Sequence, residues 1–275
     1  MALASLPPRK IALRWAEATG TFAAFVLRRE RRRARANLDK VFGGEKSGDE
    51  IDRITSECFI HLAKHAADLS RFSKMPGTEL ELLVSCDDRS QFDSALARGK
   101  GLLGLSGHIG NWELMAAWFA LKGYPIYAVG RKLRDARVNR LVTGIRENKG
   151  VKTIDRDQSA LTLMRTLRQG KAVGVLIDQD TKVDSVVVDF FGHPARTPVG
   201  LARLAIRSRA SVIPLGIHRR PDDGYHISID PPVFPLSEDD RPSPEELTQR
   251  FNHALEKMIL RDPAQWVWFH KRWRV

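Results

Sequence analysis

The sequence predicts an α/β fold: a mixed, largely parallel sheet flanked by helices, after an amino-terminal helical segment. From residue 82 onward, short apolar runs alternate with stretches of helical periodicity, which is typical of strands joined by helical crossovers. Before residue 75 the periodicity is helical throughout, and 43% of the 275 residues are hydrophobic, enough for a sizeable core. We therefore expect a membrane-associating helical segment at 1–75 and an α/β core at 76–275.

The amino-terminal segment is expected to form two helices, at 10–42 and 49–72, separated by the breaker-rich stretch "GGEKSGD". In the second helix, apolar residues return every three or four positions from Ile51 onward. His61 and His65 have the spacing of two metal ligands on one helix. Because no third ligand accompanies them in a recognisable motif, we expect ordinary helix residues.

The α/β part divides at glycines and polar turns, and three of its six expected helices end in glycine. Apolar and β-branched runs predict strands at 82–87, 101–107, 124–131, 151–155, 171–178, 185–192, 211–220 and 225–233. Helical periodicity predicts helices at 90–100, 111–123, 135–150, 159–170, 197–210 and 242–263.

The formal net charge of +12 predicts an anionic partner: nucleic acid, an anionic membrane surface, a phosphorylated substrate or an acidic carrier protein. Residues 9–40 hold ten Lys or Arg against three acids, with a dense cluster at "RRERRRAR". A solvated helix face is the alternative interpretation of this run. The two cysteines, Cys58 and Cys86, lie far apart, which fits a reducing compartment and predicts neither a disulfide nor a metal site.

The apolar stretch 11–27 is too short for a bilayer span and contains Arg14 and Glu17, and it lacks the cleavage site of a signal peptide. Trp15, Phe22 and Phe25, together with Ala18, recur at helical spacing just before the arginine cluster. That combination indicates a helix at an anionic membrane interface. A helix that packs its aromatic face into the core would show the same periodicity.

The stretch "LLGLSGHIGNWEL" sets His108 five positions before Glu113, between an expected strand and an expected helix. Gly107 and Gly110 permit a turn, and Asn111 is suited to cap the helix. The carboxylate would then hold one imidazole nitrogen while the other takes a proton from a substrate hydroxyl. An ordinary helix start, with the acid favoured by the helix dipole, is the alternative.

The same stretch contains Gly104, Gly107 and Gly110, which also suggests the phosphate loop of an NADP-binding oxidoreductase with Arg131 at the 2′-phosphate. The loop begins about a hundred residues into the chain, and no Tyr is followed four residues later by Lys. A nucleic-acid-binding protein would explain the charge, but no helix-turn-helix, zinc finger or RNA-binding motif is evident. We expect no nucleic acid as partner.

Several separate stretches together resemble bacterial lipid A biosynthesis acyltransferases, the late or secondary acyltransferases, from about Arg31 to Arg274. They are similar to successive blocks of that family, in order: "RARANLDKVF", "GHIGNWE", "GRKLRDARVNRLVTGIRENKG", "GVLIDQDTKVDSVVVDFFGHPARTPVGLARLA" and "DPAQWVWFHKRWR". Many members also carry an amino-terminal membrane span, which we do not find here. We therefore expect peripheral attachment through the first helix.

The resemblance implies transfer of a fatty acyl group to a hydroxyl of an anionic glycolipid at the cytoplasmic face of the bacterial inner membrane. The donor it implies is a thioester, on acyl carrier protein or, as in related actinobacterial enzymes that acylate phosphatidylinositol mannosides, on coenzyme A. No cofactor and no metal ion are expected.

The resemblance also implies roles for individual residues. His108 takes that of general base and Glu113 that of its carboxylate partner. Arg131 and Arg146 would bind phosphate or stabilise the thioester oxyanion. The remaining expected substrate-binding residues are Asn111, Asp178 and Asp180, although the two aspartates would also suit a turn.

At the carboxyl terminus, Trp266, Trp268, Phe269 and Trp273 are interleaved with basic residues. Aromatic and basic side chains together favour a lipid interface. A terminal strand that packs its tryptophans into the core is equally consistent with the pattern.

Overall fold

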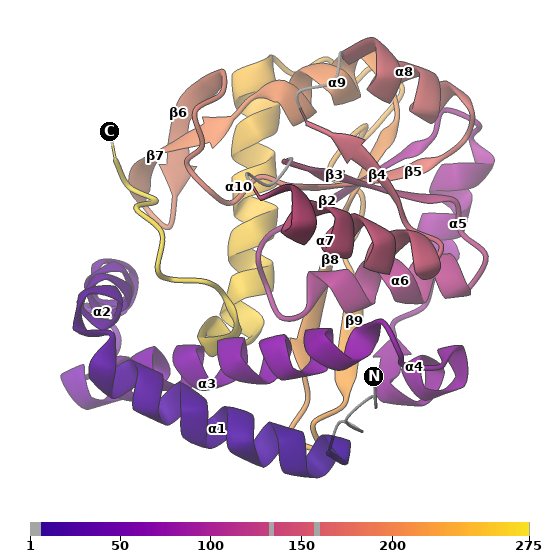
Figure 1. Ribbon diagram of the computed structural model, residues 1–275. Helices are drawn as coiled ribbons and strands as arrows, with labels where there is room; N and C mark the ends of the chain where they lie inside the picture. The colour runs from indigo at the N-terminus through magenta and orange to yellow at the C-terminus, as the bar shows by residue number, and fades with distance from the viewer. Residues whose placement is uncertain (1–6, 132–134, 157–159, 275) are drawn as a thin grey trace.

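The computed structural model describes residues 7–131, 135–156 and 160–274, and it confirms the predicted α/β fold with an amino-terminal helical segment (Figure 1). Within those ranges the main sheet has seven strands in the order β1-β9-β8-β2-β5-β3-β4. All neighbouring pairs are parallel except β8 and β9. The strands are β1 (Val84–Cys86), β2 (Leu102–Ser106), β3 (Ile126–Gly130), β4 (Lys152–Asp155), β5 (Ala172–Leu176), β8 (Ser211–Arg219) and β9 (Tyr225–Ile229).

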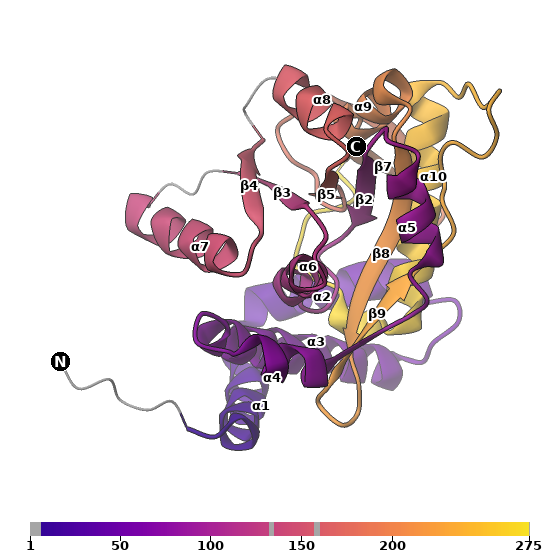
Figure 2. The same cartoon turned by 90° about the vertical axis from the view of Figure 1, so that its right-hand side faces the viewer.

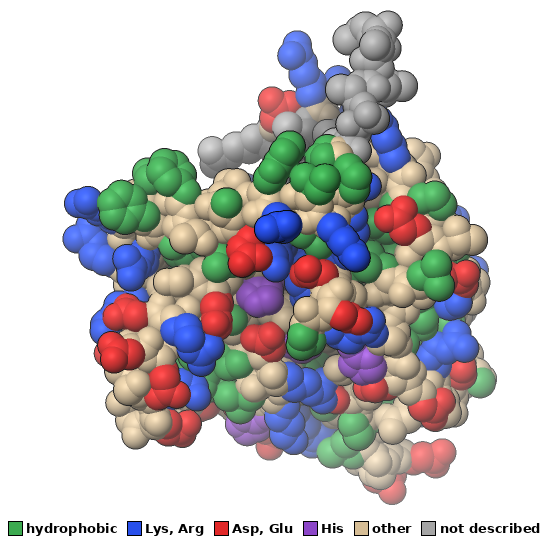
Figure 3. All heavy atoms as spheres, turned by 90° about the horizontal axis from the view of Figure 1, so that it is seen from below, with side chains coloured by type: hydrophobic (Ala, Val, Ile, Leu, Met, Phe, Trp, Pro, Cys, Tyr) green, Lys and Arg blue, Asp and Glu red, His purple; other side chains and the backbone are tan. Residues whose placement is uncertain are grey.

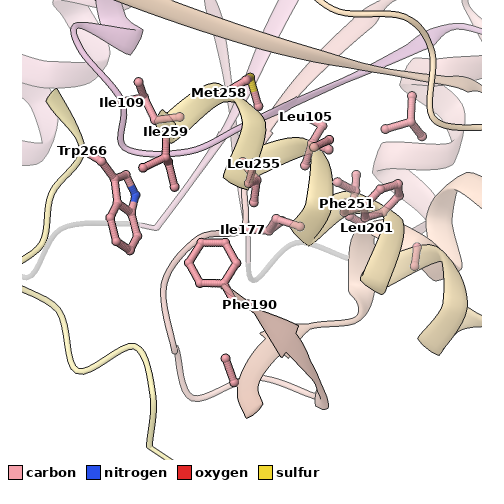
Figure 4. Close-up of a cluster of buried hydrophobic side chains, with 14 of the residues drawn as sticks. Leu105, Ile109, Ile177, Phe190, Leu201, Phe251, Leu255, Met258, Ile259 and Trp266 are labelled. Atoms are coloured by element: carbon pink, nitrogen blue, oxygen red, sulfur yellow. The ribbon is translucent and has the colours of Figure 1, made fainter. Parts of the chain in front are cut away.

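Helices cover both faces of the sheet, and two hydrophobic clusters fill the space beneath them. The first face is covered by α4 (Gly77–Leu83), α5 (Ser90–Ala97), α6 (Trp112–Leu121) and α7 (Ala136–Asn148). The second is covered by α8 (Ala160–Arg168), α9 (Gly200–Ser208) and α10 (Pro244–Arg261). Figure 2 shows α7 and α10 on opposite sides of the strands. In Figure 4, Ile177, Phe190 and Trp266 lie beside α10 in the second cluster.

The structure corrects several expected boundaries. The first expected helix is two, α1 (Arg9–Val26) and α2 (Arg28–Phe42), because the backbone leaves helical geometry at Leu27, with φ −82° and ψ 62°. Helix α4 occupies part of the chain assigned to a strand. Strand β6 (Ser185–Phe190) pairs with the unpredicted β7 (His193–Pro198) in a hairpin outside the main sheet.

The remaining expected elements lie near their predicted positions, including α3 (Gly48–Phe72). Residues 157–159, where we expected one helix to begin, lie outside the described residues. A short 3₁₀ turn, η1 (Pro263–Gln265), follows α10, and no strand follows it in the described carboxyl-terminal segment.

Helix α1 packs closely against α3 through small residues. Its buried side is formed by Leu13, Ala16, Gly20 and Ala24. A Cβ on Gly20 would lie 2.6 Å from the Cα of Ile60, so only glycine permits this approach. Buried side chains of α2 and α3 belong to the same cluster as α9 and α10. The division into a helical segment and an α/β core stays a prediction.

A buried ion network also joins the amino-terminal helices to the sheet. The carboxylate of Asp68 on α3 is fully buried and accepts hydrogen bonds from Arg9 of α1 at 2.7 and 2.9 Å. It also accepts from Arg219 and from the hydroxyl of Tyr225, both at 2.8 Å. These partners outweigh the effect of burial and hold the pKa of Asp68 below its ordinary value. The network ties α1 to the extended β8–β9 hairpin.

Candidate active site

His108 and Asp178 meet at the carboxyl edge of the sheet because each follows one of two adjacent parallel strands, β2 and β5. The imidazole Nδ1 lies 2.8 Å from Oδ1 of Asp178, and the backbone N–H of His108 donates to Oδ2 at 2.8 Å. Asp178 is fully buried, whereas the side chain of His108 is 24% exposed. The carboxylate therefore fixes both the ring and the loop that carries it.

Trp266 completes the support of this carboxylate. Its Nε1–H donates to Oδ2 of Asp178 at 2.7 Å from a position that is 1% exposed. Trp266 and Trp268 are buried in the core, which excludes the interfacial interpretation of these two residues, and no strand carries them in the described carboxyl-terminal segment. Nothing in their local sequence separates an indole that meets a carboxylate from one that meets lipid.

The glycines of the loop allow close approach of the protein's own groups. A Cβ on Gly107 would lie 3.2 Å from the carboxyl carbon of Asp178. Gly110 has φ +54°, and a Cβ there would lie 1.8 Å from the carbonyl oxygen of Ile217. Its N–H donates to the carbonyl oxygen of Gln265 at 2.9 Å. These contacts account for both glycines without a nucleotide phosphate.

The charges around His108 stabilise its protonated form. Burial disfavours the imidazolium, but the charge and hydrogen bond of Asp178, with a contribution from Glu113, outweigh burial and raise the pKa of His108 above its ordinary value. For Asp178, burial is outweighed by the charge of His108 and by hydrogen bonds from His108 and Trp266, so its pKa is lowered. An ionised Asp178 requires the proton of neutral His108 on Nδ1, which leaves the lone pair on Nε2.

Glu113 does not hold the imidazole, contrary to the pairing with His108 that the sequence predicts. Its carboxylate lies in the first turn of α6 and accepts two hydrogen bonds from Arg146 of α7, from Nε at 2.8 Å and from Nη2 at 2.5 Å. The bond to Glu113 outweighs burial and raises the pKa of Arg146. The hydrogen bonds of Arg146 thus go to Glu113. The Nη1 atom of Arg146 lies against Gly130.

The other expected site residues differ in their access to solvent. Asn111 is 4% exposed, and its Oδ1 caps α6 by accepting from the N–H of Leu114 at 3.4 Å, so it supports the loop from inside. Asp178 is expected from the sequence to contact substrate. In the structure its carboxylate is fully buried and supports His108 from inside the protein. Arg131 follows β3 and is exposed, and Asp180 is half-buried in the loop after β5.

Two residues that we did not assign to the site lie beside His108. The ring of Trp112 meets the imidazole edge-on with centroids 4.8 Å apart, and the centroid of the His270 ring lies 6.0 Å from that of His108. The Nε2 atoms of His270 and Gln179 are 2.6 Å apart. His270 comes from the carboxyl-terminal segment, more than 150 positions along the chain, and sequence spacing carries no signal for that proximity.

A mainly apolar pocket begins beside these residues and runs between α6 and the sheet. Its floor is a row of small residues that are paired in register on β2, β5 and β3: Gly104, Gly174 and Ala128. Its roof comes from α6: Trp112, Met115, Ala116 and Phe119. Ser106, Glu113 and Arg146 are its polar lining residues. The absence of side chains at the two glycines creates the space.

Metal ligands do not gather in the part of the chain that the structure describes. No three or more His, Cys, Asp or Glu side chains there are placed to hold a metal ion. His61 and His65 lie on α3 with ring centroids 6.2 Å apart, and both are half-buried; the loss of solvation lowers the pKa of each.

Comparison with known proteins agrees with this geometry. The family described as bacterial lipid A biosynthesis acyltransferase matches residues 1–275. The chain belongs to this family. It is accordingly an acyltransferase, and the oxidoreductase and nucleic-acid-binding alternatives are set aside.

Its relatives act on more than one class of lipid, as their names state. The chain is 25% identical to the phosphatidylinositol mannoside acyltransferase of Mycolicibacterium smegmatis over 87% of its own length and 78% of the relative's. It is 26% identical to the Mycobacterium tuberculosis protein of that name over 66% of this chain, but the match spans only 57% of that relative. Identity to the lipid A biosynthesis acyltransferase of Haemophilus influenzae is 25%, over 90% of this chain and 77% of the relative.

Proposed function

We propose that this acyltransferase moves a fatty acyl group from a thioester to a hydroxyl of an anionic glycolipid, with His108 as general base and Asp178 as the group that orients it. The observation that carries this proposal is the 2.8 Å contact between Nδ1 of His108 and the buried Asp178, which leaves Nε2 directed away from the carboxylate. A base that is held in one tautomer beside an apolar pocket suits the activation of a lipid hydroxyl.

In the proposed reaction, Nε2 of His108 takes the proton of the acceptor hydroxyl while the hydroxyl oxygen attacks the thioester carbonyl carbon. The imidazolium that forms is stabilised by the Asp178 carboxylate. When the tetrahedral intermediate collapses, the carbon–sulfur bond breaks and the sulfur leaves with the proton from His108. The products are an ester and a free thiol, and no protein nucleophile is needed.

We assign the acyl chain of the donor to the pocket under α6. An acyl chain is apolar, and so are the floor of Gly104, Gly174 and Ala128 and the roof of α6. The polar lining residues Glu113 and Arg146 lie at the carboxyl side of the sheet, where the thioester would have to meet His108. Arg131 and Asp180, exposed and half-buried at the same edge, are the proposed contacts for polar parts of the two substrates.

Replacing His108 with alanine is expected to lower the rate of acyl transfer by at least about 10²-fold, the lower range for a lost general base. The measurement is transfer from an acyl-carrier-protein thioester and from acyl-CoA to a lipid hydroxyl, followed by mass spectrometry. His253, an exposed histidine on α10, gives the matched variant His253→Ala, which should keep the rate. Full activity of a folded His108→Ala protein would refute the assignment.

We also propose that α1 attaches the protein to the membrane peripherally. Its outer face exposes Trp15, Phe22 and Phe25 by 64%, 67% and 65%, which excludes the interpretation that this aromatic face packs into the core. Figure 3 shows hydrophobic side chains along the upper edge of this side of the molecule and Lys and Arg side chains beyond their left end. Among the described helices, none is both long and apolar enough to span a bilayer. Apolar and basic side chains on one surface suit an anionic interface such as the cytoplasmic leaflet.

Replacing these three aromatic residues of α1 with serine is expected to weaken binding to phosphatidylcholine vesicles by at least about tenfold, because each removes a large apolar surface from the interface. Co-sedimentation with vesicles measures the change. The control replaces three exposed apolar residues away from α1, Leu161, Val187 and Leu236, with serine. Equal losses in both triple variants would show that α1 has no special part in attachment.

A further inference from the structure

The carboxyl-terminal segment and α2 form a cluster of four cations next to the proposed active site. Two side chains of α2 join these elements. Asn37 of α2 donates to the carbonyl oxygens of Trp268 and His270 at 2.7 and 2.8 Å, and Arg33 donates to that of Phe269 at 3.4 Å. Arg29 lies one turn before Arg33 on the same face of the helix. Lys271 and Arg274 follow on the other side of the contact, and together with Arg29 and Arg33 they are the cation cluster.

No carboxylate neutralises the cation cluster in the part of the chain that the structure describes. The salt bridge on α2 belongs to Arg35, which pairs with Asp52 at 2.9 Å. Arg29, Lys271 and Arg274 are exposed, and Arg33 is half-exposed. The charge of Arg274, followed by burial and by the charges of Arg33 and Arg29, lowers the pKa of Lys271. Such repulsion between like charges is relieved when an anion binds.

The position of the cluster indicates which substrate it serves. Trp112 lines the apolar pocket and contacts His108, and the ring of His270 also lies near His108, with centroids 6.0 Å apart. The backbone of His270 is held by α2, and the next residue, Lys271, belongs to the cation cluster. His108 thus has one neighbour that lines a pocket suited to an acyl chain and another that precedes a surface suited to an anion.

The neighbouring α1 places the cluster at the level of lipid headgroups. The exposed aromatic face of α1 ends at Val26, and α2 begins two residues later at Arg28. If the aromatic residues enter the bilayer, as proposed above, the arginines that follow lie in the headgroup layer. Guanidinium groups donate forked hydrogen bonds that match a phosphate, so several of them together favour that group over a single carboxylate.

We propose that Arg29, Arg33, Lys271 and Arg274 form a binding site for the phosphate group of a membrane lipid, which holds the phosphate-bearing acceptor beside His108. This inference rests on the proposed function in assigning the lipid as acceptor. The phosphate binding itself is independent of turnover. The site lies outside the motif that contains His108 and joins two segments at opposite ends of the chain.

The test compares phosphatidylcholine vesicles that contain phosphatidic acid with vesicles that contain diacylglycerol, the same lipid without the phosphate. A third set contains a carboxylate lipid at the same surface charge as phosphatidic acid. We expect the protein to bind phosphatidic acid vesicles most tightly of the three. The double variant Arg33→Gln, Lys271→Gln should lose about thirtyfold in affinity for these vesicles, in line with the contribution of two basic residues at a membrane surface, and should bind diacylglycerol vesicles unchanged.

A matched control removes the same charge elsewhere. Lys100 and Arg207 are exposed near the amino ends of β2 and β8, at the opposite edge of the sheet from His108, and neither forms an ion pair among the described residues. Lys100→Gln, Arg207→Gln should retain full affinity. Equal losses in the two double variants would overturn the proposal, because net charge alone would then explain binding. Equal affinity for phosphate and carboxylate vesicles would overturn it too.

Two further arms separate the sources of the phosphate and the two proposals. Inorganic phosphate at equal ionic strength should compete only weakly, and complete displacement by it would assign the cluster to free phosphate instead of a lipid. His108→Ala is expected to end acyl transfer and to leave vesicle binding unchanged. Absence of acyl transfer in the unmodified protein would therefore leave the binding result intact. Absence of phosphate-specific binding would likewise leave the result for acyl transfer intact.

Discussion

Replacing Asp178 with asparagine is expected to lower kcat by about 10³-fold while the protein stays folded, since an oriented general base contributes roughly 10²–10⁴. In the structure, Oδ2 of Asp178 accepts from the N–H of His108 and from Trp266, and Oδ1 meets Nδ1 of His108. The amide oxygen of asparagine must take the position of Oδ2, because that position faces two donors. Its NH₂ group would then face Nδ1 and drive the proton of neutral His108 to Nε2. The lone pair would then be on Nδ1, and Nε2 could no longer accept a proton from the substrate.

The same variant should also shift the pH dependence of the residual rate. In the unmodified protein the pKa of His108 is raised, so the base is protonated, and kcat falls, as the pH drops through a value above the ordinary 6.5. Without the Asp178 charge the imidazolium loses its main stabilising partner, and the acid limb moves to lower pH. Profiles of kcat against pH measure this shift. Asp184→Asn, which removes an exposed carboxylate paired with Arg203, is the control and should match the unmodified protein.

An asparagine variant with full activity and an unmoved acid limb would contradict the role of Asp178. The pH profile is informative because a merely structural carboxylate would change the amount of folded enzyme and leave the midpoint of the acid limb in place. Glu113→Gln offers a comparison. Glu113 contributes less than Asp178 to the raised pKa of His108, so its loss should move the acid limb in the same direction by a smaller amount.

Replacing Gly110 with alanine is expected to lower the free energy of unfolding by at least about 3 kcal/mol, one of the larger effects of a single substitution. The added Cβ would lie 1.8 Å from the carbonyl oxygen of Ile217, and φ +54° disfavours any residue with a Cβ. Relief requires the loop to move away from β8, which breaks the hydrogen bond from Gly110 to Gln265. Denaturant unfolding of the two proteins measures the difference.

The matched substitution is Gly200→Ala at the start of α9, where a Cβ would meet no atom within 4 Å. It should leave the free energy of unfolding within about 1 kcal/mol of the original, because alanine is the better helix former. Should Gly110→Ala prove equally mild, the loop around His108 would have to be more adaptable than its contacts with Ile217 indicate.

The expected fold and the position of His108 followed from local sequence pattern. Alternating apolar runs and glycine-terminated helices place β2 (Leu102–Ser106) and α6 (Trp112–Leu121) within a residue or two of their predicted bounds. His108 was expected in the loop between them, and it lies there. These features depend on residues close together in the chain, and hydrophobic periodicity and turn chemistry act over that range.

Glu113, the partner expected for His108, does not hold the imidazole, and local sequence pattern could not have shown this. Glu113 lies five residues after His108 in the chain and Asp178 lies seventy residues after it, yet Asp178 holds the imidazole. The choice depends on β2 and β5 being neighbours in the sheet, so that the loops after them meet. Arg146, at the end of a different helix, takes Glu113 instead. The interfacial role considered for Trp266 and Trp268 was wrong in the same way, since both are buried in the core.

The sequence by itself determined the α/β class, the excess of positive charge, the amphipathic first helix and the motif with a histidine at the end of a strand. Only the tertiary structure decided which carboxylate holds that histidine, which face of α1 stays exposed, and that α2 and the carboxyl-terminal segment meet. The physical reason is that propensity and periodicity act along the chain, whereas hydrogen-bond partners are chosen by strand order and packing across it.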